Sequence, residues 1–472
     1  MLLGACAVGP DYVKPAVSMP AAYKENVDWH ASDWRSAQPA DTLKRGAWWE
    51  VFGDPVLNGL EQQVDVSNQS LAQVEAQYRQ ARALVGEARA SYFPTVGVSA
   101  SATRSGRYAN AAGTVLAPGA PDSSHPSDFY SLPFTASWEP DLWGRVRRTV
   151  EANVDNAQAA AATIESTRLS LQAELAQSYL QLRITDEQKR LLDDTVAGYQ
   201  KSLKLTQNQY NVGVAARADV VEAQAQLQSA QAQAIDLGIA RAQFEHAIAL
   251  LIGKAPADVS ITVQPLKVSA PPIPPAGLPS ELLERRPDVA IAERQAASAN
   301  AQIGVAKAAY FPSLTLSATG GFESSIFSRW LQAPSIFWSL GPQLAATLFD
   351  GGLRRAQTAQ ARAGYDAAVA NYREVVLAAL QNVEDNLAAL RILEQEAAVQ
   401  ADAVKSSEQF LQITLNQYRA GTVSYLNVVT AQATAYANER TAIGILGTRL
   451  NDSVALIKAL GGGWQASDLV RK

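Results

Sequence analysis

The pattern of hydrophobic and polar positions changes period at four places along this chain. Apolar and polar residues alternate from residue 95 to 105 and again from 129 to 139, which predicts two β-strands that each have one apolar face. The same alternation at 313–322 and 336–347 predicts two more strands. Between these segments the pattern is helical, and residues 144–212 contain no Pro and one interior Gly. That stretch predicts a helix about 100 Å long.

Turn residues mark where the predicted helices begin and end. Asp54 followed by Pro55 predicts the start of a helix that ends before Pro94, because Asp caps a helix and Pro fits its first turn. Two tip turns, at 210–219 and 418–427, each carry a Gly of the kind that closes a helix C-terminus. Shorter helices are predicted to return from these turns, at 219–252 and 427–460.

The chain contains the same unit twice. Residues 203–226 and 411–434 are identical at 11 of 24 positions, an offset of 208, and Tyr-Phe-Pro at 92–94 returns at 310–312, an offset of 218. The difference of ten residues falls in the loop between the two strands of each half, where a change in length costs least. The predicted organisation is a signal peptide remnant (1–5), an N-terminal extended segment (6–54), a first repeat (55–254), a Pro-rich connector (255–279), a second repeat (280–460) and a C-terminal tail (461–472).

The long helices carry a seam of apolar or small residues with a heptad spacing. In the first repeat the seam includes Thr206 and Tyr210, and in the second repeat Thr414 and Tyr418. This spacing predicts long helices that pack along each other as in a coiled coil.

Four alternating strands leave an apolar face that helices engaged with each other do not cover. Each strand has the length of a tilted transmembrane β-strand, and a sheet in lipid tolerates no open edge. Four strands cannot close a barrel, so several copies must pool them, and three copies give twelve strands and room for a duct. The predicted fold is mainly α with a transmembrane β-barrel shared by several copies. The alternative is a small antiparallel sheet in a soluble protein.

The amino-acid composition of the chain mainly argues against certain classes of function. The net charge is −5 and there is no basic cluster, so nucleic acid is not an expected partner. Three His and one Cys do not favour a metal site and exclude an internal disulfide. No apolar run is long enough to predict a membrane-spanning helix. Motifs of serine hydrolases, zinc proteases and P-loop enzymes are absent, so we expect neither an enzyme nor a cofactor.

The single cysteine, Cys6, follows Leu3-Gly4-Ala5 and fits a lipobox. We therefore expect a covalent lipid on Cys6, since two or three acyl chains hold a membrane firmly. The five preceding residues are fewer than a signal peptide contains and are interpreted as a remnant of one. Ala7 after the cysteine favours the outer membrane of a bacterium. A buried thiol without a lipid is the alternative.

Several motifs, in order along the chain, resemble one known family. They are Cys6-Ala7-Val8-Gly9-Pro10-Asp11-Tyr12 with Pro15, Trp48-Trp49, Phe52-Gly53-Asp54-Pro55, the two Tyr-Phe-Pro junctions, Glu284-Arg285-Arg286-Pro287-Asp288, Phe349-Asp350-Gly351-Gly352 and the two Tyr-x-x-Gly turns. Over essentially the whole chain they resemble the outer membrane factors. These are the TolC-like exit ducts, here in the lipoprotein branch that serves resistance-nodulation-division efflux pumps.

The resemblance implies a homotrimer, with a twelve-stranded barrel in outer membrane lipid above a long periplasmic α-helical barrel. It implies that the protein is the outer membrane channel of a tripartite efflux pump for drugs or other small toxic compounds. The implied partners are a periplasmic membrane-fusion adaptor protein and an inner-membrane resistance-nodulation-division transporter. Two alternatives are a conduit for type I protein secretion and a periplasmic coiled-coil protein that forms no channel.

The resemblance also implies roles for residues at the two tips. By position, the periplasmic gate consists of Arg217, Asp219, Leu426, Asn427 and Thr430. The residues implied to contact the adaptor are Tyr210, Gly213, Tyr418 and Gly421, although the glycines could serve turn geometry alone.

The chain departs from the family at the gate, because members often have Asp where this sequence has Asn427 or Thr430. Asp219 is interpreted either as a ring that selects cations, with Arg217 pairing to it across helices, or as a plain helix N-cap. Leu426 is interpreted either as an apolar plug or as a residue of the helix seam.

Overall fold

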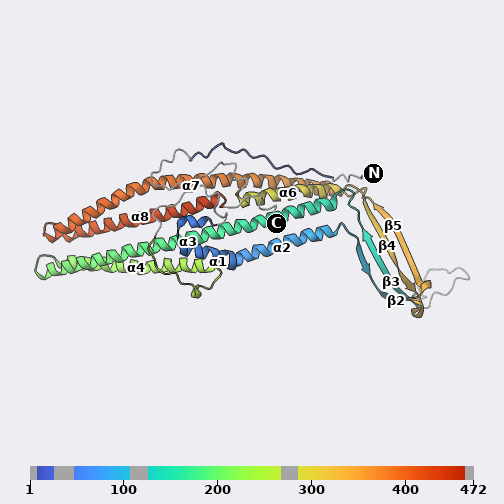
Figure 1. Ribbon diagram of the computed structural model, residues 1–472, viewed down its shortest axis with the longest axis horizontal. Coiled ribbons are helices and arrows are strands. Elements are labelled where there is room, and N and C mark those ends of the chain that lie inside the picture. The colour runs from blue at the N-terminus through green and yellow to red at the C-terminus, as the bar shows by residue number, and fades with distance from the viewer. Residues whose placement is uncertain (1–7, 26–46, 107–125, 267–284, 463–472) are drawn as a thin grey trace, which may run out of the picture. The chain divides into compact units, whose positions relative to one another are not determined.

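The computed structural model describes residues 8–25, 47–106, 126–266 and 285–462. Six of the described α-helices form three pairs of equal length, and Figure 1 shows their arrangement. The pairs are α2 (Gln69–Ala90) and α6 (Pro287–Ala308) with 22 residues each, α3 (Arg145–Asn211) and α7 (Leu353–Arg419) with 67 each, and α4 (Arg217–Leu251) and α8 (Tyr425–Ala459) with 35 each. Each of these three helices in the first half of the sequence therefore has a counterpart of the same length in the second half, whereas α1 (Pro55–Ser67) has none among the described residues.

The chain divides into two compact units. The strand unit consists of Met1–Pro15, Arg79–Ala157 and Arg294–Ala370 and holds the sheet. The helical unit consists of Ala16–Tyr78, Gln158–Glu293 and Asn371–Lys472 and holds the turns between the long helices. In the described part of the chain, none of the helices has both the length and the apolar character to cross a bilayer.

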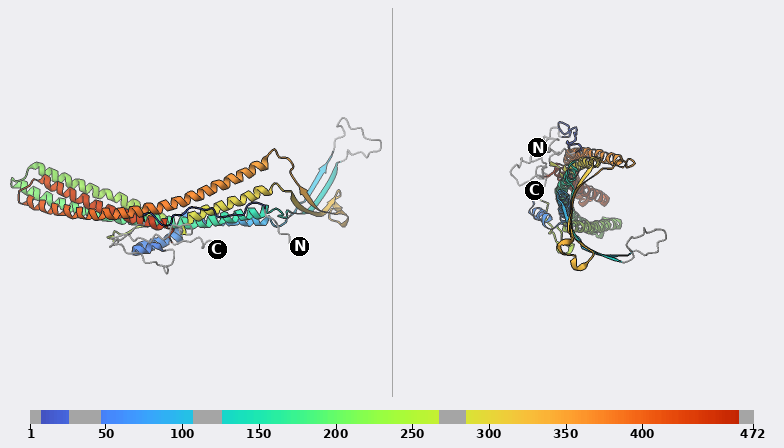
Figure 2. Two further views of the ribbon diagram at one scale, coloured as in Figure 1. Left: turned by 90° about the horizontal axis from the view of Figure 1, so that it is seen from above. Right: turned by 90° about the vertical axis from the view of Figure 1, so that its right-hand side faces the viewer.

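The strand unit contains one curved antiparallel sheet, built from both halves of the chain (Figures 1 and 2). Its strands are β1 (Thr95–Val98), β2 (Ser101–Ser105), β3 (Ser127–Trp138), β4 (Ser313–Ser324) and β5 (Ile336–Ala345). β3 pairs with β1 and β2 on one side and with β4 on the other, and β4 pairs with β5. The two halves meet between β3 and β4. The outer sides of β1–β2 and of β5 have no strand partner among the described residues.

The register collects the alternating residues of different strands into common rows. Residues opposite each other in antiparallel strands point to the same face. Two neighbouring rows show this, the apolar row Val96–Ala136–Ala318–Leu340 and the polar row Gly97–Thr135–Thr319–Ser339. The sheet therefore has an apolar face and a polar face. Described residues leave much of the apolar face exposed, with Trp338 79% exposed and Leu340 74% exposed, whereas Phe327 and Trp330 pack on Tyr130 at one end.

The strand predicted at 95–105 is divided in the structure. Ser99 and Ala100 belong to neither β1 nor β2, although the Ser99 N–H still donates to the carbonyl of Pro133 on β3 (3.2 Å). In the loop between β4 and β5, residues Phe327–Arg329 and Ala333–Ser335 form the short 3-10 helices η4 and η5.

The helix predicted to run from Pro55 to residue 93 is also divided, into α1 (Pro55–Ser67) and α2, at Asn68. The Asn68 Oδ1 accepts a hydrogen bond from the Leu71 N–H (3.1 Å) and so caps α2. Its Nδ2 donates to the carbonyl of Leu251 at the end of α4 (2.7 Å). A buried side chain that is bonded at both ends favours the break over a continuous helix.

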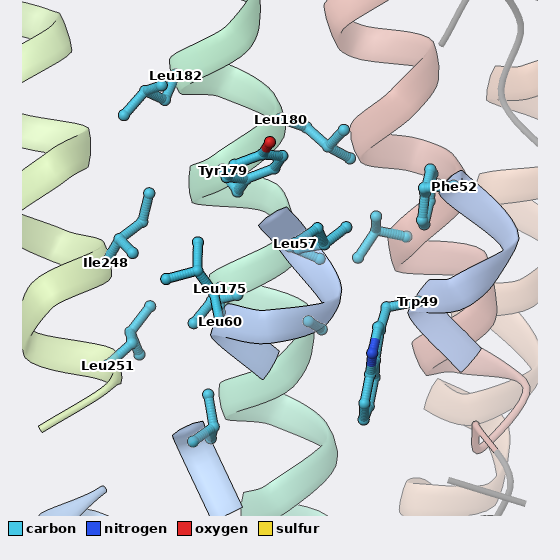
Figure 3. Close-up of a cluster of buried hydrophobic side chains, with 14 of the residues drawn as sticks. Trp49, Phe52, Leu57, Leu60, Leu175, Tyr179, Leu180, Leu182, Ile248 and Leu251 are labelled. Atoms are coloured by element: carbon cyan, nitrogen blue, oxygen red, sulfur yellow. The ribbon is translucent and has the colours of Figure 1, made fainter. Parts of the chain in front are cut away.

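The main core of the helical unit lies where α1 packs on the middle of α3 (Figure 3). The 3-10 helix η1 (Trp48–Phe52) precedes α1, and Asp54 caps α1 by accepting from the Val56 N–H (2.8 Å). The hydroxyl of Tyr179 on α3 donates to the other oxygen of Asp54 (2.7 Å), which joins the cap to the core. Buried members of this cluster include Trp49, Phe52, Leu57, Leu175, Leu180, Leu182, Ile248 and Leu251.

A buried ion-pair network holds the start of the connector against α3 and α4. Arg183 donates to Asp186 (3.2 Å) and to the carbonyl of Thr262 (2.7 Å). Arg241 on α4 donates to the second oxygen of Asp186 (2.8 Å). The connector begins with the 3-10 helix η2 (Pro256–Asp258). Its residues 267–279 lie outside the described residues, as do the first five residues of the second repeat, the predicted signal remnant and most of the C-terminal tail.

Candidate functional site: the turns between the long helices

Two hairpins, α3–α4 and α7–α8, lie side by side in the helical unit (Figures 1 and 2). In the first turn, the Gly213 N–H donates to the carbonyl of Tyr210 (2.9 Å) and the Val214 N–H to the carbonyl of Gln209 (2.8 Å). These two bonds form a Schellman motif, which satisfies carbonyls that the helix end would leave unpaired. The turn is therefore held by its own backbone.

The second turn repeats this geometry. The Gly421 N–H donates to the carbonyl of Tyr418 (3.0 Å) and the Thr422 N–H to the carbonyl of Gln417 (3.0 Å). Both glycines are left-handed, with φ of 80° at Gly213 and 75° at Gly421. Apart from the adjoining residues of the chain, no heavy atom of the described residues lies within 4 Å of where a Cβ would stand at either glycine. The motif thus requires Gly for its backbone conformation, and space for a side chain is available.

The tyrosines of the two turns have different surroundings. Tyr418 is 5% exposed, and its hydroxyl donates to Oγ1 of Thr206 on α3 (3.1 Å). Its ring centre lies 5.6 Å from that of Tyr425. Tyr210 is 44% exposed. In the single chain the seam predicted in the first repeat does not extend to Tyr210, because no described residue gives this side chain a contact like the one that Thr206 gives Tyr418.

Further polar contacts join the hairpins next to the turns. Nε2 of Gln432 on α8 donates to Oγ of Ser202 on α3 (2.9 Å), and Nε2 of Gln209 donates to the carbonyl of Tyr418 (3.4 Å). Sequence reasoning missed Ser202 and Gln432, because Ser and Gln recur throughout these helices and do not stand out. Thr206 had a signal, as a polar residue at a seam position.

Burial raises the pKa values of the two tyrosines at the second turn. Desolvation raises the pKa of Tyr425 well above its ordinary value, and the neighbouring Tyr418, Glu222 and Asp219 add to the shift. Desolvation likewise raises the pKa of Tyr418. The Tyr425 hydroxyl is buried without a hydrogen-bond partner among the described residues. Both tyrosines are therefore neutral at any pH that a cell meets.

Asp219 and Arg217 lie in the first turn of α4, which begins two residues before the predicted position. The N-cap of α4 is Ala216, so the interpretation of Asp219 as an N-cap is wrong. Oδ2 of Asp219 accepts from the Ala216 N–H (3.1 Å), which is the reciprocal half of a capping box. Arg217 is exposed at the start of the helix.

The candidate gate residues of the second repeat occupy the first two turns of α8. Leu426 is 58% exposed, and Asn427 and Thr430 are also exposed. Oγ1 of Thr430 donates to the carbonyl of Leu426 (3.0 Å). On the same helix Tyr425 and Val428 are buried. In the single chain the three candidates thus face away from the packed side of α8.

Cys6, the expected lipid site, lies outside the described residues. Among the residues that the structure describes, no group of three or more His, Cys, Asp and Glu side chains is placed to hold a metal ion. The turns combine a rigid backbone, open space beside Gly and polar links between hairpins.

The sequence matches a family of known proteins. The family model described as outer membrane efflux protein matches residues 60–254 and 278–462. The chain is 31% identical to the probable efflux pump outer membrane protein TtgC of Pseudomonas putida, over 98% of this chain and 94% of that protein. It is 30% identical to the pyoverdine export outer membrane protein OpmQ of Pseudomonas aeruginosa, over 99% and 96% of the two chains.

Solved structures share the fold. The outer-membrane channel OprN has a TM-score of 0.87 and 30% identity, over 97% of this chain and all of that one. The open state of the Neisseria gonorrhoeae MtrE outer membrane channel has a TM-score of 0.82 and 26% identity, over 97% and 98% of the two chains. The resemblance found in the motifs, the mainly helical fold with one sheet, and the match of both repeats agree, and the chain belongs to the outer membrane efflux protein family.

Proposed function

We propose that three copies of this chain form the exit duct of an efflux pump across the outer membrane and the periplasm. The observation that carries this proposal is the apolar face of the sheet, which the described chain leaves mostly exposed apart from the end where Phe327 and Trp330 pack on Tyr130. Trp338 and Leu340 are both about three-quarters exposed. Contact of these apolar side chains with water is unfavourable, whereas contact with lipid is favourable. The polar face would then line an aqueous passage.

The free edges of the sheet support a trimer. An edge strand in lipid leaves N–H and C=O groups unpaired, which costs several kcal/mol per group, so β5 of one copy would pair with β1 and β2 of the next. Three copies would close a barrel of twelve strands, counting β1 and β2 as one. The long helices would continue the duct as an α-helical barrel in the periplasm.

A lipid on Cys6 would add a second attachment to the membrane. Acyl chains gain about 0.8 kcal/mol per buried CH₂ group, so a diacylated or triacylated cysteine would not leave the bilayer. The rest of the N-terminal segment would then begin at the membrane surface.

The tips would supply the gate and the docking site. Arg217 and Asp219 from α4, with Leu426, Asn427 and Thr430 from α8, would form the constriction of the closed duct. Tyr210, Gly213 and Gly421 would receive a periplasmic adaptor protein, and the adaptor would connect the duct to an inner-membrane resistance-nodulation-division transporter. Tyr418, which the resemblance also implies as an adaptor contact, is 5% exposed and would instead hold the second turn in place. The exposure of Leu426 favours its role as an apolar plug.

Efflux is favoured over type I protein secretion because the relatives carry the names of efflux and export proteins. Transport is also favoured over catalysis, because the family and the relatives are described as efflux proteins. Single-channel conductance in a planar bilayer would test the duct itself, and a purified protein that inserts without conducting would contradict it.

The docking role is tested by Gly213→Asp and Gly421→Asp in a strain that depends on this channel for resistance. We expect each variant to abolish pump-dependent resistance while trimers still assemble, because the charge projects into open space at the tip. Gly364→Asp, at an exposed position of α7 that also has open space, is the matched control and should leave resistance unchanged. Full resistance in both tip variants would remove the tips from docking.

A further inference from the structure

The loop between β4 and β5 has a defined structure at the end of the sheet away from the helices. α6 precedes β4 and α7 follows β5, so residues 325–335 lie at the opposite end of these strands (Figure 1). The hydroxyl of Ser335 donates to the carbonyl of Arg329 (2.8 Å), and Oγ of Ser324 accepts from the Ile326 N–H (3.1 Å). These bonds and the 3-10 helices η4 and η5 fix the shape of the loop.

The β4–β5 loop folds onto the apolar face of the sheet. Tyr130 on β3 points to the same face as Ala136, because residues an even number apart in a strand share a face. The ring centre of Tyr130 lies 5.3 Å from that of Phe327 and 5.8 Å from that of Trp330. Nε1 of Trp330 donates to the carbonyl of Phe322 on β4 (3.3 Å). The loop therefore turns toward the apolar face and away from the polar face that would line the duct.

Large apolar side chains of this loop are nevertheless exposed. Phe327 is 67% exposed and Leu331 61%, and Ile326 is exposed beside them. Single exposed apolar residues are common on protein surfaces, whereas a continuous apolar surface marks contact with a partner or a membrane. This surface continues the apolar face of the sheet, which the proposed function places in lipid. Lipid is therefore the partner that fits the loop as well.

Charged side chains appear where the apolar surface ends. Arg104 on β2 and Asp128 on β3 lie opposite each other, two residues beyond the pair Ala102–Tyr130, and they form an exposed ion pair (3.7 Å). Arg329 in η4 is also exposed, and no ion pair joins its guanidinium to a described residue. A guanidinium group binds phosphate through two parallel hydrogen bonds. An unpaired Arg beside exposed aromatic rings is thus suited to the phosphate of a lipid headgroup.

We propose that the β4–β5 loop lies in the outer leaflet of the membrane, where Phe327 and Leu331 contact acyl chains and Arg329 binds the phosphate of a lipid. This inference rests on the proposed function, which places the apolar face of the sheet in lipid, and adds to it a binding site for an anionic lipid. Aromatic rings suit this position because they favour the boundary between lipid and water. Each copy of the trimer would hold one such lipid at the rim of the barrel, and the loop would stay clear of the exit.

The position of the loop is tested with a fluorescent label in the assembled protein. Leu331→Cys and Leu340→Cys are made in a Cys6→Ser chain that is exported with a signal peptide other than a lipoprotein signal. Each is labelled with nitrobenzoxadiazole and reconstituted into phosphatidylcholine vesicles. We expect both labels to show the blue-shifted emission of a lipid environment. Spin labels at the lipid headgroup should quench the label at 331 more strongly, and spin labels deep in the acyl chain the label at 340.

Val263→Cys is the matched control, because Val263 is exposed in the helical unit, and its label should emit as in water. A label at 331 that emits as in water, beside a label at 340 in lipid, would overturn this inference and leave the proposed function intact. Labels in water at both positions would overturn the inference together with the place of the sheet in lipid.

The phosphate contact is tested by lipid binding to the purified full-length trimer. The trimer is equilibrated with phosphatidylcholine micelles that contain diphosphorylated lipid A or the same lipid without its phosphates, and native mass spectrometry counts the bound lipid. Arg329→Gln should raise the concentration of diphosphorylated lipid A at half-saturation about tenfold, the size expected for one lost hydrogen bond between charged groups. The lipid without phosphates should bind equally to the variant and to the wild type.

Arg362→Gln is the control for the loss of a charge, since Arg362 is exposed on α7 away from the loop, and it should bind lipid as the wild type does. Unchanged binding in Arg329→Gln, or equal binding of the two lipids by the wild type, would overturn the phosphate site. Inorganic phosphate at the same concentration should not displace the lipid, because the acyl chains also contribute. Displacement would mean that Arg329 binds a free anion and would likewise overturn the lipid as its ligand. Conductance and resistance are measured separately, so none of these outcomes is confused with failure of the channel.

Discussion

The two helical hairpins have the same length and the same turn, yet the tyrosine at the end of the first long helix is exposed and its counterpart in the second is buried. Both turns have Schellman hydrogen bonds and a left-handed Gly. Tyr418 is nevertheless buried against Thr206, and Tyr210 is exposed. The backbone of a turn follows from its local sequence, whereas the surroundings of a side chain depend on which helix lies next to it. In the proposed trimer, we expect a neighbouring copy to supply the packing contact that Tyr210 lacks in the single chain.

The largest expected contrast comes from truncating each tyrosine in the solubilised single chain. Removing a buried aromatic side chain costs about 3 kcal/mol, so Tyr418→Ala should lower the free energy of local opening of the α7–α8 tip by that amount. Tyr210→Ala should change it by less than about 0.5 kcal/mol, as at other exposed positions. Native-state amide hydrogen exchange at the tips measures both. Equal effects would show that the two tips are packed alike.

A second contrast is between the titratable groups of the tips and those of the core around α1. The tip tyrosines stay neutral at any pH that a cell meets and so add no pH dependence to stability. In the core, desolvation, with Asp65 adding to it, raises the pKa of the buried Glu61 to about 9, which lies within reach of ordinary pH. Neither carboxyl oxygen of Glu61 has a hydrogen-bond partner among the described residues.

Because Glu61 keeps its proton in the folded state and loses it near pH 4.5 when unfolded, stability is greatest below pH 4.5 and falls between about pH 4.5 and 9. Glu61→Gln should raise the thermal unfolding temperature at pH 8 and flatten its dependence on pH. Asp65→Asn is the control, since it removes only the minor cause of the shift. A pH dependence that survives in Glu61→Gln would place the responsible group elsewhere.

The smallest expected effect tests whether the two turns really share one backbone. A side chain at positive φ costs about 1 kcal/mol, and a Cβ has room at both glycines. Gly213→Ala and Gly421→Ala should therefore lower the stability of their own tips by the same small amount, measured again by hydrogen exchange. A markedly larger loss at one tip would mean that its turn depends on contacts beyond the backbone.

Features coded over a few residues could be predicted from the sequence. The Gly of each Tyr-x-x-Gly motif marks the turn, and the absence of Pro between residues 144 and 212 indicates α3. The alternation of polar and apolar residues predicts strands, and the register then brings Val96, Ala136, Ala318 and Leu340 into one row. The turns, the helix and the single strands depend on backbone preferences that act locally, whereas the register depends on pairing between strands far apart in the sequence.

Features that depend on distant partners could not be predicted. Asn68 interrupts a helical pattern because its side chain reaches the end of α4, far along the sequence. Asp219 is a local exception, because it serves as the third residue of a helix that begins two residues earlier than the sequence pattern indicates. The pairing of Ser202 with Gln432 requires that two hairpins lie together. The roles of the gate residues and of Cys6 remain predictions.

The equal lengths of the paired helices limit how this gene can evolve. Deleting one residue from α3 alone would shift its turn by about 1.5 Å and rotate it by about 100°, and Thr206 would no longer face Tyr418. An insertion in one long helix therefore has to be balanced in its partner helices before it can persist. The loop between the paired strands carries no such constraint, and natural length variation should accumulate there.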